Sequence, residues 1–427
     1  MLNRTIAPKI TDATGFTLTL PPFEKHRLRN GVDIFMLNLG ELDTLMINWV
    51  FDAGNFYEEK NLVAGAANYL LKNGTTSKSA YAINEHFEYY GSYLSRSCQN
   101  EFADVTLHCL GKHVHELLPV VAEIFTVSVF PQEELDIFKK NMQQRLLVGL
   151  KKSDFVAGRM IDAYLFGEKH PYGRMSSVED YESLHRDEIA EFFDRYYHQG
   201  RCVIFVAGKI PTGLIQQMER EFGSLPMLAH VEAAVKHHHI IHAKEKKYRI
   251  NNDPNGVQGS IRIARNFPNR HHPDFQKMQV LNNLFGGFFG SRLMSNIREE
   301  KGYTYGIHSY LMNHVEQSAF LITTEAGKEV CEATIEEVYK EMAILREDPV
   351  DEEELSTTRN FMIGVILGDL DGPFQVASRW KNIVLNNLDA NYFYRSIDII
   401  KTISSAELQD LASKYFRPEE FYELVVV

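Results

Sequence analysis

One order of strand-like and helix-like patterns occurs twice along this chain of 427 residues. Each half opens with strand patterns, continues through long helical patterns and closes with a short apolar strand, CVIFVAG (202–208) in the first half and FYELVVV (421–427) in the second. Two copies of one order, about 200 residues each, indicate an internal duplication. Since each half mixes strands with helices, we predict two α+β domains joined by a long linker.

A loss of pattern marks the joint between the halves. Residues 222–246 lose clear periodicity and gain charge, as linkers do. We therefore place one domain at 23–221 and the other at 247–427. The linker carries three histidines at 237–239 and a fourth at His242. Consecutive histidines rarely converge on one ion, so we interpret them as solvated linker residues, with adventitious metal binding as the alternative.

Local signals place several elements. Asn30-Gly31 supplies the positive-φ turn chemistry of a hairpin, and Pro131 followed by two glutamates suits the first turn of a long helix. We expect further strands at 44–53 and within 94–110, and a helix at 60–73.

Composition excludes some classes of function. The chain has 45 Lys and Arg against 57 Asp and Glu, a net charge of −12 that is spread along the sequence. Nucleic-acid and anionic-membrane binding need a dense positive footprint, so neither is expected as the main role. No apolar stretch approaches the roughly 18 residues of a membrane span, and the N-terminus shows no apolar signal segment. We expect a cytoplasmic protein, with four isolated cysteines that form no CxxC pair.

Five segments together resemble one family, the M16 (pitrilysin-type) zinc peptidases, which include the mitochondrial processing peptidase. They follow the family's order along nearly the whole chain. The segments are LRNGVDIF (28–35), FDAGNFYE (51–58), NLVAGAANYLLKNGT (61–75), HPYGR (170–174) and GGFFGSRLMSNIREEKGYTYGIHS (286–309). The resemblance implies the LuxS/M16 metallohydrolase-like α+β fold of two homologous domains, each an antiparallel sheet covered by helices. In it, His170 of HPYGR is expected to be a structural loop residue and not a general base.

The metal site that the resemblance implies has lost its ligands. Active members carry HxxEH on a helix, where two histidines bind zinc and the glutamate is the general base. Gly65, Asn68 and Tyr69 stand at these three positions. Glycine has no ligand atom, an amide cannot take a proton from water at neutral pH, and a phenol is a poor zinc ligand. The helix at 137–153, where the family's third ligand would lie, contains no Asp or Glu, so we expect no catalytic zinc in this chain.

The first half has lost the expected zinc ligands, but the second half keeps the two residues that are expected to contact the substrate. The resemblance implies that active members use an Arg and a Tyr seven residues apart to hold the substrate carbonyl and the oxyanion near the metal; here these are Arg298 and Tyr305. A guanidinium and a phenol stabilise charge that develops on a carbonyl oxygen. The alternative is structural: Arg298 pairs with Glu299 or Glu300, and Tyr305 packs within a strand.

The split between the halves predicts a division of labour. We expect a chain that is inactive alone and forms the non-catalytic subunit of a heteromeric M16 zinc metallopeptidase. It would bind peptide substrate and donate Arg298 and Tyr305 to an HxxEH-bearing partner that holds the zinc. One alternative is a purely structural or peptide-binding scaffold protein without a role in proteolysis. Another is a stand-alone hydrolase with a relocated metal site.

Overall fold

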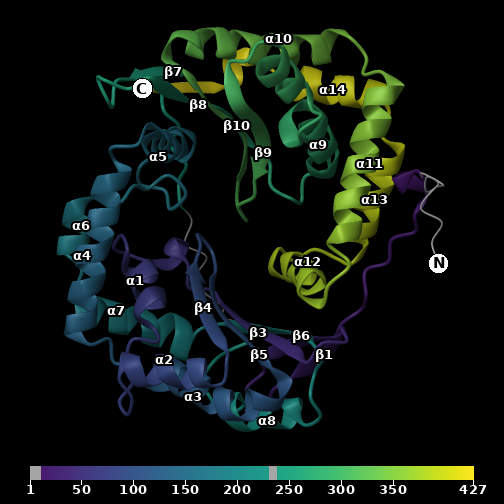
Figure 1. Ribbon diagram of the computed structural model, residues 1–427. Coiled ribbons are helices and arrows are strands. Elements are labelled where there is room, and N and C mark those ends of the chain that lie inside the picture. The colour runs from purple at the N-terminus through teal and green to yellow at the C-terminus, as the bar shows by residue number, and fades with distance from the viewer. Residues whose placement is uncertain (1–10, 230–237) are drawn as a thin grey trace, which may run out of the picture.

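The computed structural model describes residues 11–229 and 238–427 (Figure 1). The first half builds a six-stranded sheet in the order β1-β2-β6-β3-β5-β4. Its strands are β1 (Glu24–Arg27), β2 (Asp33–Asn38), β3 (Thr44–Phe51), β4 (Tyr93–Cys98), β5 (Ala103–Leu110) and β6 (Cys202–Gly208).

The second half builds a five-stranded sheet in the order β7-β11-β8-β10-β9. Its strands are β7 (Lys247–Ile250), β8 (Gln258–Phe267), β9 (Thr304–Met312), β10 (Ser318–Gly327) and β11 (Tyr422–Val426). In this order, β7, β11, β8, β10 and β9 occupy the same places as β2, β6, β3, β5 and β4 in the first sheet. The duplication expected from the sequence is therefore present in the topology.

Both sheets are mainly antiparallel, and each contains one parallel pair, β2 with β6 and β7 with β11. The parallel pair arises because the closing strand of each half inserts between two strands that are consecutive in sequence: β6 lies between β2 and β3, and β11 lies between β7 and β8. The predicted α+β fold of two helix-covered sheets is confirmed, with this parallel pair as the departure from purely antiparallel sheets.

Helices account for most of the remaining chain. In the first half they are α1 (Val63–Leu70), α2 (Ala80–Tyr89), α3 (Val114–Val127), α4 (Gln132–Gly149), α5 (Ser153–Phe166), α6 (Val178–Glu182), α7 (Arg186–Phe193) and α8 (Leu214–Phe222). In the second half they are α9 (Asp274–Asn282), α10 (Cys331–Glu347), α11 (Glu352–Gly368), α12 (Pro373–Leu385), α13 (Asn391–Thr402) and α14 (Ser405–Tyr415). A short π-helix, η6 (Met294–Glu300), precedes β9.

The predicted hairpin forms between β1 and β2, where Gly31 has a φ of 91°. This left-handed conformation suits glycine because it has no Cβ. The neighbouring Asn30 accepts from the backbone N–H of Val32 and donates to the carbonyl oxygens of Phe222 and Leu225. The turn is therefore fixed to the end of α8.

The two halves exchange helices. In Figure 1 the two sheets lie at opposite ends of the molecule, with α4 and α6 along one side and α11 and α13 along the other. Helix α5 of the first half packs against β8 and β11 of the second sheet, whereas α12 of the second half packs against β6 and β2 of the first. Lys381 of α12 pairs with Asp104 of β5, and the ring of Tyr164 on α5 stacks 3.8 Å from that of Tyr248 on β7. The domain division at 23–221, 222–246 and 247–427 stays a prediction.

The described part of the linker is docked. The backbone N–H groups of Ile241 and Ala243 donate to carbonyl oxygens of Phe166 and Tyr164, and the Nδ1 atom of His242 lies 2.8 Å from the oxygen of Leu165. The backbone of this segment is therefore docked at the end of α5, while His239 and His242 are exposed, as expected for solvated linker residues. His237 lies outside the described residues.

Two further observations concern the whole described chain. Cys109, Cys202 and Cys331 are buried and Cys98 is half-buried, all as free thiols. Among residues 11–229 and 238–427, no helix combines the length and the apolar character that a membrane crossing requires.

Candidate functional site

The three positions at which the resemblance predicts a lost zinc motif lie together on α1. Gly65 and Tyr69 are one turn apart and share its accessible face, while Asn68 is only 3% exposed. The Asn68 amide donates to the hydroxyl oxygen of Tyr197 at 3.1 Å and to the carbonyl oxygen of Asp104 at 3.4 Å. Where active relatives need a general base, this chain has a buried structural amide.

Zinc does not fit this helix. Tyr69 rests its ring 4.9 Å from that of Phe138 on α4, so the helix expected to supply a third ligand supplies an aromatic contact. Within the described ranges, no group of three or more His, Cys, Asp or Glu side chains could hold a metal ion. The chain's own residues therefore provide no metal chemistry at α1.

The start of α1 is held by Glu58, a residue whose role the sequence analysis missed. Its carboxylate accepts from the backbone N–H of Ala64 at 2.8 Å and of Leu62 at 3.2 Å, which satisfies free donors at the helix start. Arg174 of the HPYGR segment pairs with the same carboxylate. Burial raises the pKa of Glu58 to about 7, although Arg174 opposes that shift. Two of the family-like segments thus meet to anchor the helix.

His170 belongs to a junction between the two halves. Its ring lies 4.6 Å from that of Tyr172, and Tyr172 stacks 4.0 Å from His314 in the β9–β10 hairpin of the second half. The Nδ1 atom of His170 accepts from the backbone N–H of Tyr172, while its buried Nε2 atom has no hydrogen-bond partner in the described chain. Burial, together with the nearby imidazoles of His238 and His314, lowers the pKa of His170 to about 4. This neutral, buried ring fits a structural residue.

The same junction contains a polar bridge. The hydroxyl group of Tyr172 donates to the carboxylate of Glu101, which also accepts from the backbone N–H of Val315 at 3.0 Å. The loop between β4 and β5, the HPYGR segment and the β9–β10 hairpin therefore meet at one place.

Arg298 and Tyr305 come together in the second half. Arg298 lies on η6 and Tyr305 near the start of β9, the edge strand of the second sheet. The Nε atom of Arg298 donates to the backbone oxygen of Tyr305 at 3.0 Å, and its guanidinium lies 4.7 Å from the ring centroid of Phe289. Both residues line an open pocket of about 640 Å³. The Tyr305 side chain is free to contact a ligand, since the residue is 93% exposed.

The structural alternative for this pair is half right. The Nη1 atom of Arg298 lies 3.6 Å from a carboxylate oxygen of Glu299, an exposed contact of the kind that contributes little stability. The packing of Tyr305 within the strand is wrong, because its side chain points into solvent. The sequence could not show this exposure, since an edge-strand tyrosine can lie on either face.

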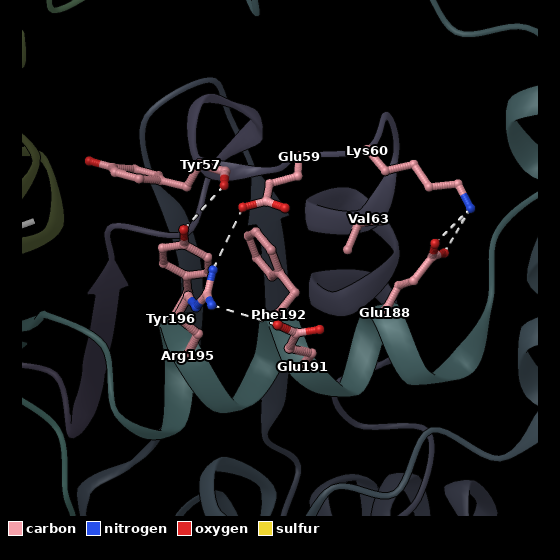
Figure 2. A pocket seen from close by; sticks show the side chains of 9 residues that line it. All are labelled: Tyr57, Glu59, Lys60, Val63, Glu188, Glu191, Phe192, Arg195 and Tyr196. Carbon is pink, nitrogen blue, oxygen red and sulfur yellow. Dashed lines mark hydrogen bonds and ion pairs between the residues drawn. The ribbon is translucent and has the colours of Figure 1, made fainter. Parts of the chain in front are cut away.

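A second pocket, shown in Figure 2, lies between the start of α1 and α7 and has a volume of about 280 Å³. Its cations are already paired: Lys60 with Glu188, and Arg195 with both Glu59 and Glu191. These ion pairs tie α7 to the start of α1. The cationic side chains that line this pocket therefore all have carboxylate partners within the chain.

Comparison with known proteins identifies the family. Residues 183–362 match the family described as "Peptidase M16 inactive domain". This match and the similarities described below support an inactive member of the peptidase M16 family. It is 24% identical over 359 residues to the uncharacterized zinc protease YmxG of Bacillus subtilis, covering 83% of this chain and 86% of that protein.

Solved structures share the fold of this M16 chain. A peptidase M16 inactive domain from Pseudomonas fluorescens aligns with a TM-score of 0.83 at 20% identity, over 95% of this chain and 98% of that one. A chain of complex III2 from Candida albicans, solved with Inz-5 bound, aligns with a TM-score of 0.73 at 14% identity, over 94% and 95% of the two chains. At these identities the likeness extends to the fold alone.

Proposed function

We propose that this M16 chain is the non-catalytic subunit of a heteromeric zinc metallopeptidase. It binds extended peptide and donates Arg298 and Tyr305 to the zinc site of an HxxEH-bearing partner. The observation that carries the proposal is the contrast between the two halves: α1 has no metal ligand, while Arg298 and Tyr305 share an open pocket.

The chemistry of the pair suits this role. A guanidinium and an exposed phenol both donate hydrogen bonds to an oxygen on which negative charge develops. Neither group can activate water, so they accelerate hydrolysis only where another chain supplies zinc and a base. The edge strands β4 and β9 offer unpaired backbone groups with which an extended peptide can pair.

The test is reconstitution. The purified chain is mixed with its HxxEH-bearing M16 partner, and cleavage of a peptide is followed. Arg298→Ala and Tyr305→Phe should each lower kcat/KM about 100-fold or more, as the loss of an oxyanion donor does, while the complex still assembles. Arg220→Ala and Tyr89→Phe serve as controls, because Arg220 also pairs with the next residue in sequence and Tyr89 is 81% exposed. Full activity of both site variants would refute the donated pair.

A scaffold protein without a role in proteolysis is the second candidate. The observation that favours it is the likeness to a chain of complex III2, which shows this fold within a larger assembly. An Arg298→Ala/Tyr305→Phe double variant that leaves every activity of the complex unchanged, while loss of the whole chain abolishes assembly, would select the scaffold.

A further inference from the structure

Arg96 lies beside the lost zinc motif. It stands on β4, the edge strand of the first sheet, and its guanidinium lies 5.3 Å from the ring centroid of Tyr69 on α1. Its Nη1 atom donates to the backbone oxygen of Tyr69 and, at 3.3 Å, to the Oδ1 atom of Asn73. This nitrogen caps the end of α1.

The rest of the guanidinium has no partner. In the part of the chain that the structure describes, the Nε and Nη2 atoms of Arg96 donate no hydrogen bond, and no carboxylate lies within ion-pair distance of them. The half-buried Arg174, Arg201 and Arg292 each pair with a carboxylate, whereas Arg96, like Arg159, has no ion pair among the described residues. Burial without a compensating charge lowers the pKa of Arg96, and the ionisable groups that act on it are the phenols of Tyr69, Tyr93 and Tyr197. A guanidinium remains charged in such surroundings.

A second cation reinforces the first. Burial, and after it the charge of Arg96, lowers the pKa of Lys72, which follows α1 by two residues. Glu88 is the carboxylate that acts on Lys72, and the two form no ion pair. Two cationic side chains, Arg96 and Lys72, therefore act at this end of α1, where the carboxylate of Glu134 accepts from the side-chain amide of Asn73 at 2.7 Å.

Open space adjoins α1 on the face that carries Tyr69. A Cβ atom placed on Gly65 would meet no atom within 4 Å, so the face of α1 that carries Gly65 and Tyr69 is uncovered one turn before Tyr69. Beside it runs β4, whose exposed edge and 65% exposed Tyr93 leave room for an added strand.

We propose that Arg96 and Lys72 form an anion site that binds a carboxylate of the peptide lying along β4. In this site the guanidinium contacts Tyr69 of α1, the helix on which the zinc ligands of active family members are expected. A guanidinium donates two parallel hydrogen bonds to a carboxylate, which adds geometric selectivity to the charge attraction. The carboxylate is either the C-terminus of the peptide or an Asp or Glu side chain. The inference rests on the proposed peptide-binding role and names the kind of peptide that is bound.

Peptide pools test the site on the full chain. Two pools of random, N-acetylated decapeptides are equilibrated with the protein, one with free C-terminal carboxylates and one with C-terminal amides, and the retained peptides are quantified by mass spectrometry. About tenfold stronger retention of the free-carboxylate pool identifies the C-terminus as the ligand. Enrichment of Asp or Glu among retained amides identifies the side chain. Equal retention without such enrichment, or no retention, overturns the site.

Variants locate the site. Arg96→Gln should abolish the preference for carboxylate, while the control Arg220→Gln on α8 should keep it. Gly65→Leu fills the open space without changing a charge and should also abolish the preference, whereas Gly65→Ala should retain it. A preference that survives both Arg96→Gln and Gly65→Leu refutes the inference, and the Gly65 pair decides alone if Arg96→Gln does not fold. The proposed function is judged separately by the cleavage assay with Arg298→Ala, so either idea can fail without the other.

Discussion

Acid should loosen the junction between the two halves, and His170 should account for a measurable part of that effect. His170 is 1% exposed, and its pKa is about 4 in the folded chain against 6.5 ordinarily. Because the folded-state pKa is depressed, the stabilising contribution is complete above pH 6.5 and is lost as the pH falls toward 4.

The magnitude follows from proton linkage. Between pH 6.5 and 4 the unfolded chain binds close to one proton more than the folded chain at this ring, a difference of about 1.4 kcal/mol per pH unit. Summed from pH 7 to pH 5, His170 should lower the free energy of unfolding by about 2 kcal/mol. Burial also lowers the pKa of His314 to about 4, so this ring acts in the same direction.

The variant His170→Asn removes the titrating ring and keeps an oxygen that can accept from the backbone N–H of Tyr172. Urea unfolding, followed by circular dichroism at pH 5, 6 and 7, measures the stability of both proteins. The variant should be less stable at pH 7, and the difference from the natural chain should shrink by about 2 kcal/mol at pH 5. His271→Asn, at an exposed position, should show no such change. A difference that stays the same from pH 7 to pH 5 would refute the reasoning.

Two further predictions concern buried charge and buried thiols. Arg174→Ala leaves the carboxylate of Glu58, whose side chain is 1% exposed, without its cation, and should cost about 3–5 kcal/mol of unfolding free energy at pH 8. The cost should be smaller at pH 6, because the pKa of Glu58 is already about 7 and rises further without Arg174, so that the carboxyl group becomes neutral. Urea unfolding at pH 6 and pH 8 measures the two costs. Equal costs would contradict this prediction. Burial raises the pKa of Cys98 and Cys109 to about 12 and that of Cys202 in the same direction, so the native chain at pH 8 should react slowly with a thiol reagent such as DTNB, and all four cysteines should react in urea. Rapid stoichiometric labelling of the native chain at any of these three cysteines would contradict this.

The sequence predicted the order of most strands and helices along the chain, but not which distant segments pack against one another. The Asn30-Gly31 hairpin, the strands of the first half and the helix that opens after Pro131 form as expected, because turn chemistry and apolar periodicity act over a few residues. Helices α12 and α13 were not predicted, and the docking of residues 238–243 along the end of α5 was missed. These features depend on surfaces supplied by distant parts of the chain, of which a local pattern carries no information.

The candidate site shows the same division. The absence of ligands at Gly65, Asn68 and Tyr69 could be stated from the letters, because a side chain without a suitable donor atom cannot bind zinc wherever it lies. The role of Asn68 as a donor to Tyr197 could not, since Tyr197 is 129 residues away in the chain.

The sequence by itself indicated a duplicated α+β protein, because local periodicity is sufficient for that conclusion. The resemblance to M16 peptidases then located the positions at which residue identity leaves no zinc ligand. The tertiary structure alone decided that Tyr305 is exposed beside Arg298 and that Arg96 stands uncompensated beside Tyr69. It also decided that the two halves exchange α5 and α12. The physical reason is that exposure, charge pairing and helix docking depend on which side chains from distant segments meet, and those meetings are set by long-range packing.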